Sequence, residues 1–342
     1  MLKDFNCELR ICSSSICSTR VISIRICSIY FVLMFWAVCF HNNLTAQQTP
    51  KRQVSDLKIT TLSTMLADRG HGEWGYSALV EVGQKKILFD TGRYPETVLN
   101  NAQRLGIDLS EVEDVVLSHN HGDHTGGVLY LREHLKSINP TAISRIHVGK
   151  GIFTKRVGRP HSMQVLKDSL EADGVEFKIY DSVQEIFPGV WLTGNVPRKY
   201  DEKNYNPNSK LETKQGEVVD IVAEDMSLFI NTTKGIVLLS GCGHSGIINT
   251  MALIQSRFKE KKITTAIGGF HLLRASDEQL KWTANQLKLF GLQQMNGAHC
   301  TGINSLVQLR DLMKGSRQNY VVGSVGDLFT LEQGIRPGAI AR

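Results

Sequence analysis

The stretch His119-Asn120-His121-Gly122-Asp123-His124 places three imidazoles and one carboxylate within six residues. It follows the apolar run Val115-Val116-Leu117, which is typical of a buried strand. Alternate residues of a strand point the same way, so the first two histidines are expected to share one metal ion, while Asp123 and His124 face a second. Imidazole nitrogen and carboxylate oxygen are ligands that zinc prefers. The pattern predicts a metal site at a strand-to-helix turn.

Strands and helices are predicted to alternate on both sides of this cluster. Apolar patterning and turn residues predict strands over 58–62, 77–82, 86–89, 114–118, 145–148, 175–180, 190–193, 227–231, 236–239, 264–267, 294–297 and 320–322. They predict helices over 96–105, 126–138, 164–172, 247–259, 277–290 and 305–313. The polar segment 197–216 is predicted to be a long surface loop. Two rounds of strand–helix units favour two sheets sandwiched between helices in one domain.

Three later histidines occur in glycine-rich turns at predicted strand ends: His244, His271 and His299. Because each follows a strand, a loop can deliver it to the same rim as the first cluster, and His244 and His299 are candidate metal ligands. His271 is equally suited to contact a substrate. Asp90, at another strand end, is a candidate partner for the outer N–H of a metal-bound imidazole. A structural histidine, or an aspartate that only caps a turn, is the alternative at each position.

Composition and charge are ordinary for a globular protein. The 342 residues are 42% hydrophobic and 21% charged, and the net charge is +6, of which the first 46 residues contribute +2. This balance offers no basic stripe, so no nucleic-acid partner is indicated, and a small-molecule substrate is expected. Five of the seven cysteines lie in the first 39 residues. Cys242 and Cys300 remain, each beside a candidate site sequence, and a disulfide between them is the less favoured alternative.

The N-terminal segment has the organisation of an export signal. Arg20 and Arg25 precede the apolar run 26–40, and Ala46 precedes a polar stretch. These features predict a signal peptide or leader over 1–46 and an exported protein, periplasmic or secreted. The apolar run is shorter than the roughly 20 residues that a membrane span needs. Cleavage of the leader would also remove this run from the mature chain. An uncleaved N-terminal membrane anchor is the alternative. The folded domain is predicted over 57–330, with a C-terminal tail over 331–342.

The combined motifs resemble a known family. Phe89-Asp90-Thr91-Gly92, the segment 118–127, Gly241-Cys242-Gly243-His244, Gly269-Phe270-His271 and His299-Cys300-Thr301-Gly302 are similar to the metallo-β-lactamase superfamily. Within it they are similar to the branch of the 7,8-dihydropterin-6-yl-methyl-4-(β-D-ribofuranosyl)aminobenzene 5′-phosphate synthases. The resemblance covers about residues 57–330, nearly all of the predicted mature chain.

The resemblance implies a four-layer αββα sandwich with a site for two divalent metal ions, for which Zn²⁺ is the expected metal. One ion would be held by His119, His121 and His244, and the other by Asp123, His124 and His299. Two differences from the family pattern stand out. Asn120 and Gly122 replace the usual variable residues, which removes an aromatic wall, and the usual Pro-Gly-His-Thr motif with its bridging aspartate is absent. Cys242 as a further ligand is therefore a hypothesis.

The implied function is a hydrolase that uses a metal-activated water on an ester or phosphoester, with Asp123 as the catalytic residue. Arg198 and Lys199 are candidate contacts for a substrate phosphate, as are Lys150 and Lys155. A pterin-related transferase is the first alternative, although cytoplasmic pterin assembly fits poorly with export. A non-catalytic metal-bound sensor is the second. A redox diiron role suits this nitrogen-rich set less well.

Overall fold

Alternation along the strands sends one set of side chains between two sheets and the other set under helices. The computed structural model describes residues 52–341. In β3 (Lys85–Phe89), Ile87 and Phe89 join the core cluster between the sheets, whereas Leu88 joins the cluster on the outer face. β12 (Gly235–Ser240) divides its side chains in the same way. This period of two, present in both sheets, produces three stacked apolar layers.

Each of the two sheets is partly antiparallel and partly parallel. The eight-stranded sheet contains, in spatial order, β17 (Gly334–Arg336), β16 (Leu328–Thr330), β1 (Leu57–Ser63), β2 (Ser77–Val82), β3, β4 (Asp114–Leu117), β5 (Arg145–Gly149) and β6 (Glu176–Tyr180). The seven-stranded sheet contains β15 (Tyr320–Val322), β14 (Gln294–Gly297), β13 (Ile263–Gly268), β12, β11 (Leu228–Thr232), β8 (Val190–Leu192) and β7 (Gln184–Phe187). β3 to β6 run parallel, and so do β12 to β15.

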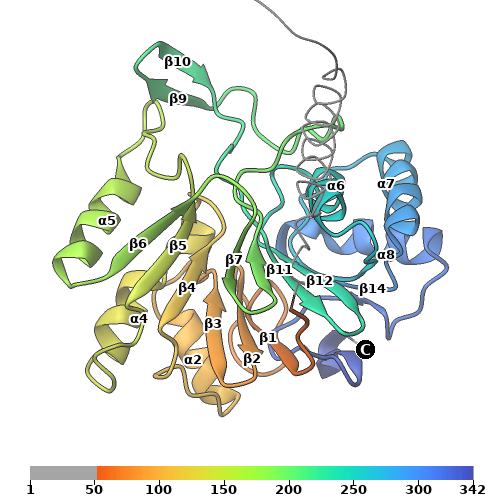
Figure 1. Ribbon diagram of the computed structural model, residues 1–342, viewed down its shortest axis with the longest axis horizontal. Coiled ribbons are helices and arrows are strands. Elements are labelled where there is room, and N and C mark those ends of the chain that lie inside the picture. The colour runs from red at the N-terminus through yellow and green to blue at the C-terminus, as the bar shows by residue number, and fades with distance from the viewer. Residues whose placement is uncertain (1–51, 342) are drawn as a thin grey trace, which may run out of the picture. The chain divides into compact units, whose positions relative to one another are not determined.

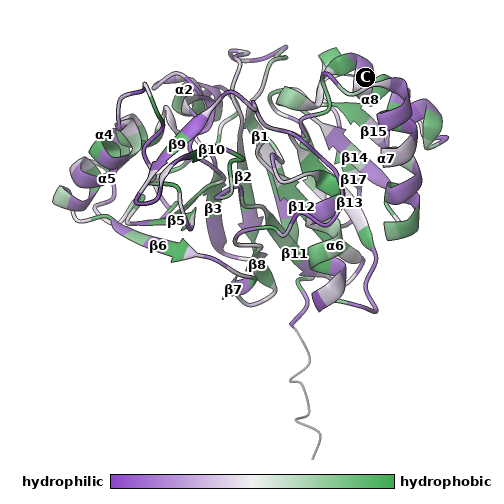
Figure 2. Cartoon of the chain, turned by 90° about the horizontal axis from the view of Figure 1, so that it is seen from above, coloured by the Kyte–Doolittle hydropathy of each residue, from purple (hydrophilic) through white to green (hydrophobic). Residues whose placement is uncertain are grey.

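Helices cover the outer face of each sheet (Figure 1, and Figure 2 from above). The eight-stranded sheet carries α2 (Thr97–Arg104), α4 (Val128–Leu135) and α5 (Ser162–Ala172). The seven-stranded sheet carries α6 (Ile247–Arg257), α7 (Asp277–Phe290) and α8 (Ile303–Leu312). The short elements are α3 (Gly122–Thr125), η1 (His299–Thr301) and η2 (Ala339–Ala341). The αββα sandwich expected from the sequence is confirmed.

The segment 197–216 differs from its prediction as a surface loop. Its end forms β9 (Lys210–Thr213), which pairs with β10 (Gly216–Val219) in a separate hairpin, visible at the top of Figure 1. Glu202 and Asn204 are buried although the segment is polar. Glu202 accepts hydrogen bonds from backbone N–H groups in the first turn of α6. This role of Glu202 could not be predicted from the polar local sequence, because the backbone N–H groups that it binds are about 46 residues away along the chain.

Several short strands were not predicted. β7 and β10 are half-buried or exposed and lack a clear apolar alternation. β16 and β17 extend the edge of the eight-stranded sheet, and β17 lies within the segment predicted as a C-terminal tail. The predicted signal peptide over 1–46 lies outside the described residues. Within residues 52–341, none of the helices has the length and apolar character that crossing a membrane requires.

A buried ion-pair network at the start of β4 generates a stability prediction. Asp114 accepts hydrogen bonds from Arg145 at 2.8 Å and from Nε2 of His147 at 3.0 Å. Burial opposes ionisation of Asp114, but these partners outweigh it and lower its pKa to about 2. Since the folded-state pKa lies below the unfolded value, the network stabilises the protein above about pH 4 and is lost as the pH falls toward 2.

Asp114→Asn should therefore lower the free energy of unfolding at pH 7 by about 1–3 kcal/mol, because it removes the buried charge that Arg145 and His147 share and leaves Arg145 with the partly exposed Glu113. The deficit relative to the natural protein should shrink between pH 4 and pH 2. Urea denaturation of both proteins across this range measures it. A deficit that stays constant with pH would contradict the assignment.

Candidate metal centre

The chemically distinctive side chains meet at the carboxyl ends of the parallel strands. Asp90 directly follows β3, and His119 lies two residues past the end of β4 in the same sheet. Cys242, His271 and His299 follow β12, β13 and β14 of the other sheet. Parallel strands end at one edge of a sheet, and the two such edges face one another here, so loops far apart in the sequence converge. The predicted common rim is thus present.

The first group of donor atoms belongs to His119, His121 and His244. One ring nitrogen of each lies within 4.8 Å of the other two. Nε2 of His119 and Nδ1 of His121 are 2.9 Å apart, near the roughly 3.3 Å expected for two nitrogens on one tetrahedral zinc ion. Burial lowers the pKa of His119 and His121 well below the usual value, and that of His244 to about 4. All three rings are therefore neutral near pH 7, the form that binds metals.

The second group consists of Asp123, His124 and His299 and lies beside the first. Oδ2 of Asp123 is 3.4 Å from Nε2 of His299 and 4.0 Å from Nε2 of His124. Burial favours a neutral Asp123, but these two imidazoles outweigh it and hold its pKa well below the usual range. The rings of His119 and His124 are 4.3 Å apart between centroids, so the two groups are adjacent. The structure thus assembles both predicted sets of three.

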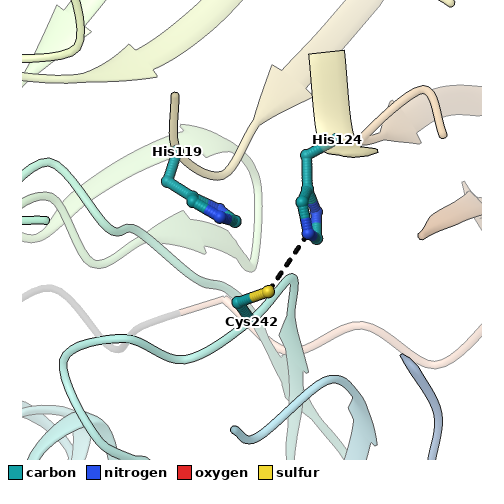
Figure 3. A group of neighbouring side chains, drawn as sticks. All are labelled: His119, His124 and Cys242. Atoms are coloured by element: carbon teal, nitrogen blue, oxygen red, sulfur yellow. Dashed lines mark hydrogen bonds between the residues drawn. The ribbon is translucent and has the colours of Figure 1, made fainter. Parts of the chain in front are cut away.

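Cys242 lies between the two groups. Its Sγ is 3.1 Å from Nε2 of His124, and a ring nitrogen of His119 is within 4.8 Å (Figure 3). Burial raises the pKa of this thiol well above its usual value, so a cation must displace the proton for Cys242 to become a ligand. Cys242 and Cys300 are both free, so the alternative of a disulfide between them is wrong.

Asp90 fixes the orientation of two imidazoles. Its Oδ2 accepts from Nδ1 of His124 and from the hydroxyl of Ser118, each at 2.7 Å. Because the Ser118 hydroxyl donates to Asp90, its oxygen accepts from Nδ1 of His119 at 2.8 Å. Both rings therefore carry a proton on Nδ1 and turn Nε2 toward the centre. Burial opposes protonation of His124, but Asp90 outweighs it and raises the pKa of His124 to about 9, so a metal ion must displace the proton on Nε2. Asp90 therefore makes the hydrogen bond to an imidazole that its predicted role as a partner requires.

His244 is oriented by the loop 197–216. Its Nδ1 donates to the backbone oxygen of Asn204 at 2.5 Å, which leaves Nε2 facing the centre. Arg198 donates to the backbone oxygen of His244 at 2.8 Å and to two further backbone oxygens. The guanidinium is thus engaged by the backbone of this loop and of its neighbours. Its contacts favour a positioning role for Arg198 over contact with a substrate phosphate.

His271 lies on the side of the first group. Its ring is 4.5 Å from that of His244, and a ring nitrogen lies within 4.8 Å of donor atoms of His244 and Cys242. Asp90, His271 and His299 each have a positive φ, between +48° and +56°, although none is glycine. Such backbone costs about 1–3 kcal/mol per residue and concentrates at functional sites. The strain at these positions indicates that donor placement outweighs backbone preference.

The donor set fits a divalent metal. Nε2 of His244 and both ring nitrogens of His299 are buried and make no hydrogen bond within the described residues. Buried polar atoms of this kind are rare unless another partner is present. Imidazole, carboxylate and thiol together form a set suited to zinc. The chemistry of the site therefore matches the divalent metal binding that this fold implies.

An aromatic wall, which the sequence predicted to be missing, comes from another loop. Trp74 packs against the imidazole of His299 with 4.7 Å between ring centroids, and 42% of its surface is exposed. Its neighbour Glu73 is buried and accepts from the backbone N–H groups of Arg93 and Tyr94, which anchors this loop. The glycine-rich sequence around Trp74 indicated a turn, but nothing in the sequence predicted that this turn lies against His299.

The lysines predicted as phosphate contacts are placed differently. Lys150 pairs with Asp181 at 3.3 Å, and Lys155 pairs with Glu212 at 2.9 Å. Lys199 is exposed, and its backbone N–H donates to Asn249. Pairing with carboxylates makes Lys150 and Lys155 poor candidates for binding a substrate anion.

Comparisons with known proteins agree with this geometry. A family model described as the metallo-beta-lactamase superfamily matches residues 75–151. The 7,8-dihydropterin-6-methyl-4-(beta-D-ribofuranosyl)-aminobenzene-5′-phosphate synthase of Methanocaldococcus jannaschii is 30% identical over 272 residues, which cover 74% of this chain and 90% of the relative. An uncharacterized protein of the same organism is 32% identical over 259 residues, covering 74% and 92% of the two chains.

Solved structures show the same fold. A metal-dependent hydrolase of the beta-lactamase superfamily superposes with a TM-score of 0.63 and 26% identity, covering 76% of this chain and 94% of that chain. The metallo-beta-lactamase fold protein YhfI from Bacillus subtilis superposes with a TM-score of 0.52 and 11% identity, covering 81% and 100%. The second similarity concerns the fold alone.

The role of Asp90 generates a prediction with an internal control. Asp90→Asn should lower zinc affinity about 10–100-fold, because the amide cannot hold both imidazoles in the required tautomer. Competition with a chelating dye measures the affinity. Asp114→Asn is the matched control, since Asp114 is also a buried aspartate but is the first residue of β4, at the opposite end of that strand from the candidate centre. Equal losses of affinity in the two variants would contradict the assignment.

Proposed function

The chain belongs to the metallo-beta-lactamase superfamily, and we propose that it is a hydrolase that uses two divalent metal ions, Zn²⁺ in the first instance, to cleave an ester or phosphoester. One observation carries the proposal: two adjacent groups of three inward-facing donors, His119/His121/His244 and Asp123/His124/His299. A single group would suffice for one structural ion. Two groups in contact suit a pair of ions acting on one bond.

The chain's own residues supply binding, orientation and proton transfer. Bound divalent ions contribute Lewis acidity, which polarises a carbonyl or phosphoryl group and lowers the pKa of water. Asp123 is the one carboxylate among the six donors, and its side chain is 17% exposed. Its depressed pKa keeps it ionised, so the carboxylate can accept a hydrogen bond from the attacking water and orient it. Trp74 excludes water from one side of His299 and provides a face for an apolar part of the substrate.

A second candidate function is supported by the named relative. The Methanocaldococcus jannaschii protein, at 30% identity, is a synthase of a pterin-containing compound. A transferase of that kind would use the same donors with a different nucleophile in place of water. Product analysis with the purified protein, a dihydropterin donor and a ribofuranosylaminobenzene phosphate acceptor separates the two activities. Export of the chain, which we propose from its leader sequence, favours the hydrolase acting on a small-molecule substrate.

Substitutions at His121 and Asp123 test the hydrolase proposal. His121→Ala and Asp123→Ala should each remove at least about half of the bound metal and lower kcat/KM on an active ester by about 10³-fold or more, as loss of a metal-site group predicts. Metal analysis and a screen of carboxyl and phosphate esters measure both effects. His134→Ala, an exposed histidine on α4, is the matched control and should change neither. Full metal-dependent activity in both site variants would refute the site.

A spectroscopic prediction concerns Cys242. In protein loaded with Co²⁺, the natural chain should show a thiolate-to-cobalt charge-transfer absorption, because Sγ lies next to donors of both groups. Cys242→Ser should lose this absorption while retaining bound cobalt. Cys300→Ser, the control at the other buried thiol, should keep it. An unchanged spectrum in Cys242→Ser would remove Cys242 from the ligand set.

A further inference from the structure

A cavity of about 200 Å³ opens beside His121. It lies between the turn 120–122 and the loop that connects β5 to α5. A second cavity of about 270 Å³ shares Arg156 and Arg159 with the first and reaches the start of β9. Pockets that hold a complete small ligand have volumes of about 300–1,000 Å³. Each cavity is therefore the size of one part of a substrate, and the first is adjacent to the candidate metal centre.

The lining of both cavities is rich in basic side chains. Arg156, Arg159, His161 and Lys210 line them, and no aspartate or glutamate of the described residues does. The hydroxyls of Thr154 and Ser162 line the first cavity as well. A cleft lined by guanidinium groups and hydroxyls, with no carboxylate in its lining, favours an anion where one of its cations is left unpaired.

Most of these cations already have partners. Arg156 donates to Asp220 at 2.6 Å, to Glu224 at 3.1 Å and to the backbone oxygen of Asn120 at 2.6 Å. It is buried, and its last contact holds the residue next to His121. Lys210 pairs with Glu217 at 2.9 Å. These contacts make the wall of the cleft a fixed part of the fold.

Arg159 differs from the other cations of the cleft. It is exposed, and among residues 52–341 no carboxylate lies within ion-pair distance of its guanidinium. The loop that carries it is held to β9 by backbone hydrogen bonds from Val157 to Lys210 and from Glu212 to Lys155. A fixed loop therefore presents an unpaired cation at the boundary between the two cavities. The guanidinium is suited to bind two oxygens of one oxyanion.

We propose that the cleft beside His121 binds an oxyanion of the substrate, a phosphate or a carboxylate, through Arg159. The proposal rests on the hydrolase function above and specifies its substrate class: an ester with an anionic group separate from the bond that is cleaved. The hydroxyls of Thr154 and Ser162 provide further hydrogen bonds to that oxyanion. Arg159 is then a specificity-determining residue that touches substrate but none of the metal-ligating atoms.

Binding of inorganic phosphate to the metal-loaded full chain gives the first test. Isothermal titration should show binding at least about tenfold weaker in Arg159→Gln than in the natural protein. Arg317→Gln is the control, since Arg317 is an exposed arginine between α8 and β15 that lines neither cavity. Any phosphate bound by the metal ions is common to all three proteins. Acetate in place of phosphate shows which oxyanion is preferred. Equal affinities of the natural protein and Arg159→Gln for both anions would overturn the proposal.

Kinetics with paired substrates give the second test. Arg159→Gln should lower kcat/KM for 4-nitrophenyl hydrogen succinate, which has a carboxylate tail, about tenfold through KM. It should leave kcat/KM for neutral 4-nitrophenyl acetate unchanged. An equal loss on both esters would overturn the proposal, because Arg159 would then act on the metal centre or the fold. If the natural protein cleaves no ester, the hydrolase proposal fails, while the phosphate titration still decides whether Arg159 binds an oxyanion.

Discussion

The carboxylate of Asp90 is buried between the ends of β3 and β4, and the metal centre depends on its three hydrogen bonds. Two of them come from Ser118 and one from His124, so a single anion aligns donors of both groups. The hydrogen-bonded pair of Asp90 and Ser118 also restricts which residue can stand at position 241, after β12 of the other sheet. A Cβ at Gly241 would lie 2.2 Å from the Ser118 hydroxyl and 2.6 Å from Oδ2 of Asp90, which only glycine avoids. Cys242 can therefore lie beside His124 because its neighbour has no side chain.

The elements that the sequence predicted well are those whose signals are local. Buried strands such as β14 and the long amphipathic helix α7 were predicted with their exact bounds, because patterning along a few residues determines them. The first donor cluster is also local, since six consecutive residues supply four donors. His244 and His299 were identified from their position after apolar strands. The geometry brings each into the predicted group, although their roles as metal ligands stay predictions.

Contacts between distant segments account for what the sequence left out. The loop 197–216 is polar, yet it buries Glu202 against α6 and uses Asn204 and Arg198 to orient His244. Polar side chains that bind backbone groups far along the chain have no apolar pattern around them. The polar composition of this segment therefore predicted an exposed loop. Trp74 was missed for the same reason. Its contact with His299 crosses between the two sheets and leaves no pattern in either local sequence.

The surroundings of the centre are asymmetric, and this asymmetry bears on the choice between hydrolase and synthase. Both candidate activities would use the same metal-binding donors and a group that orients the nucleophile, the role proposed above for Asp123. They differ in which nucleophile is admitted and which leaving group is held. Trp74 presents an aromatic face beside His299, whereas Arg159 presents a positive charge beyond His121. We therefore expect the surfaces on these two sides, rather than the donors themselves, to decide between the two proposed reactions.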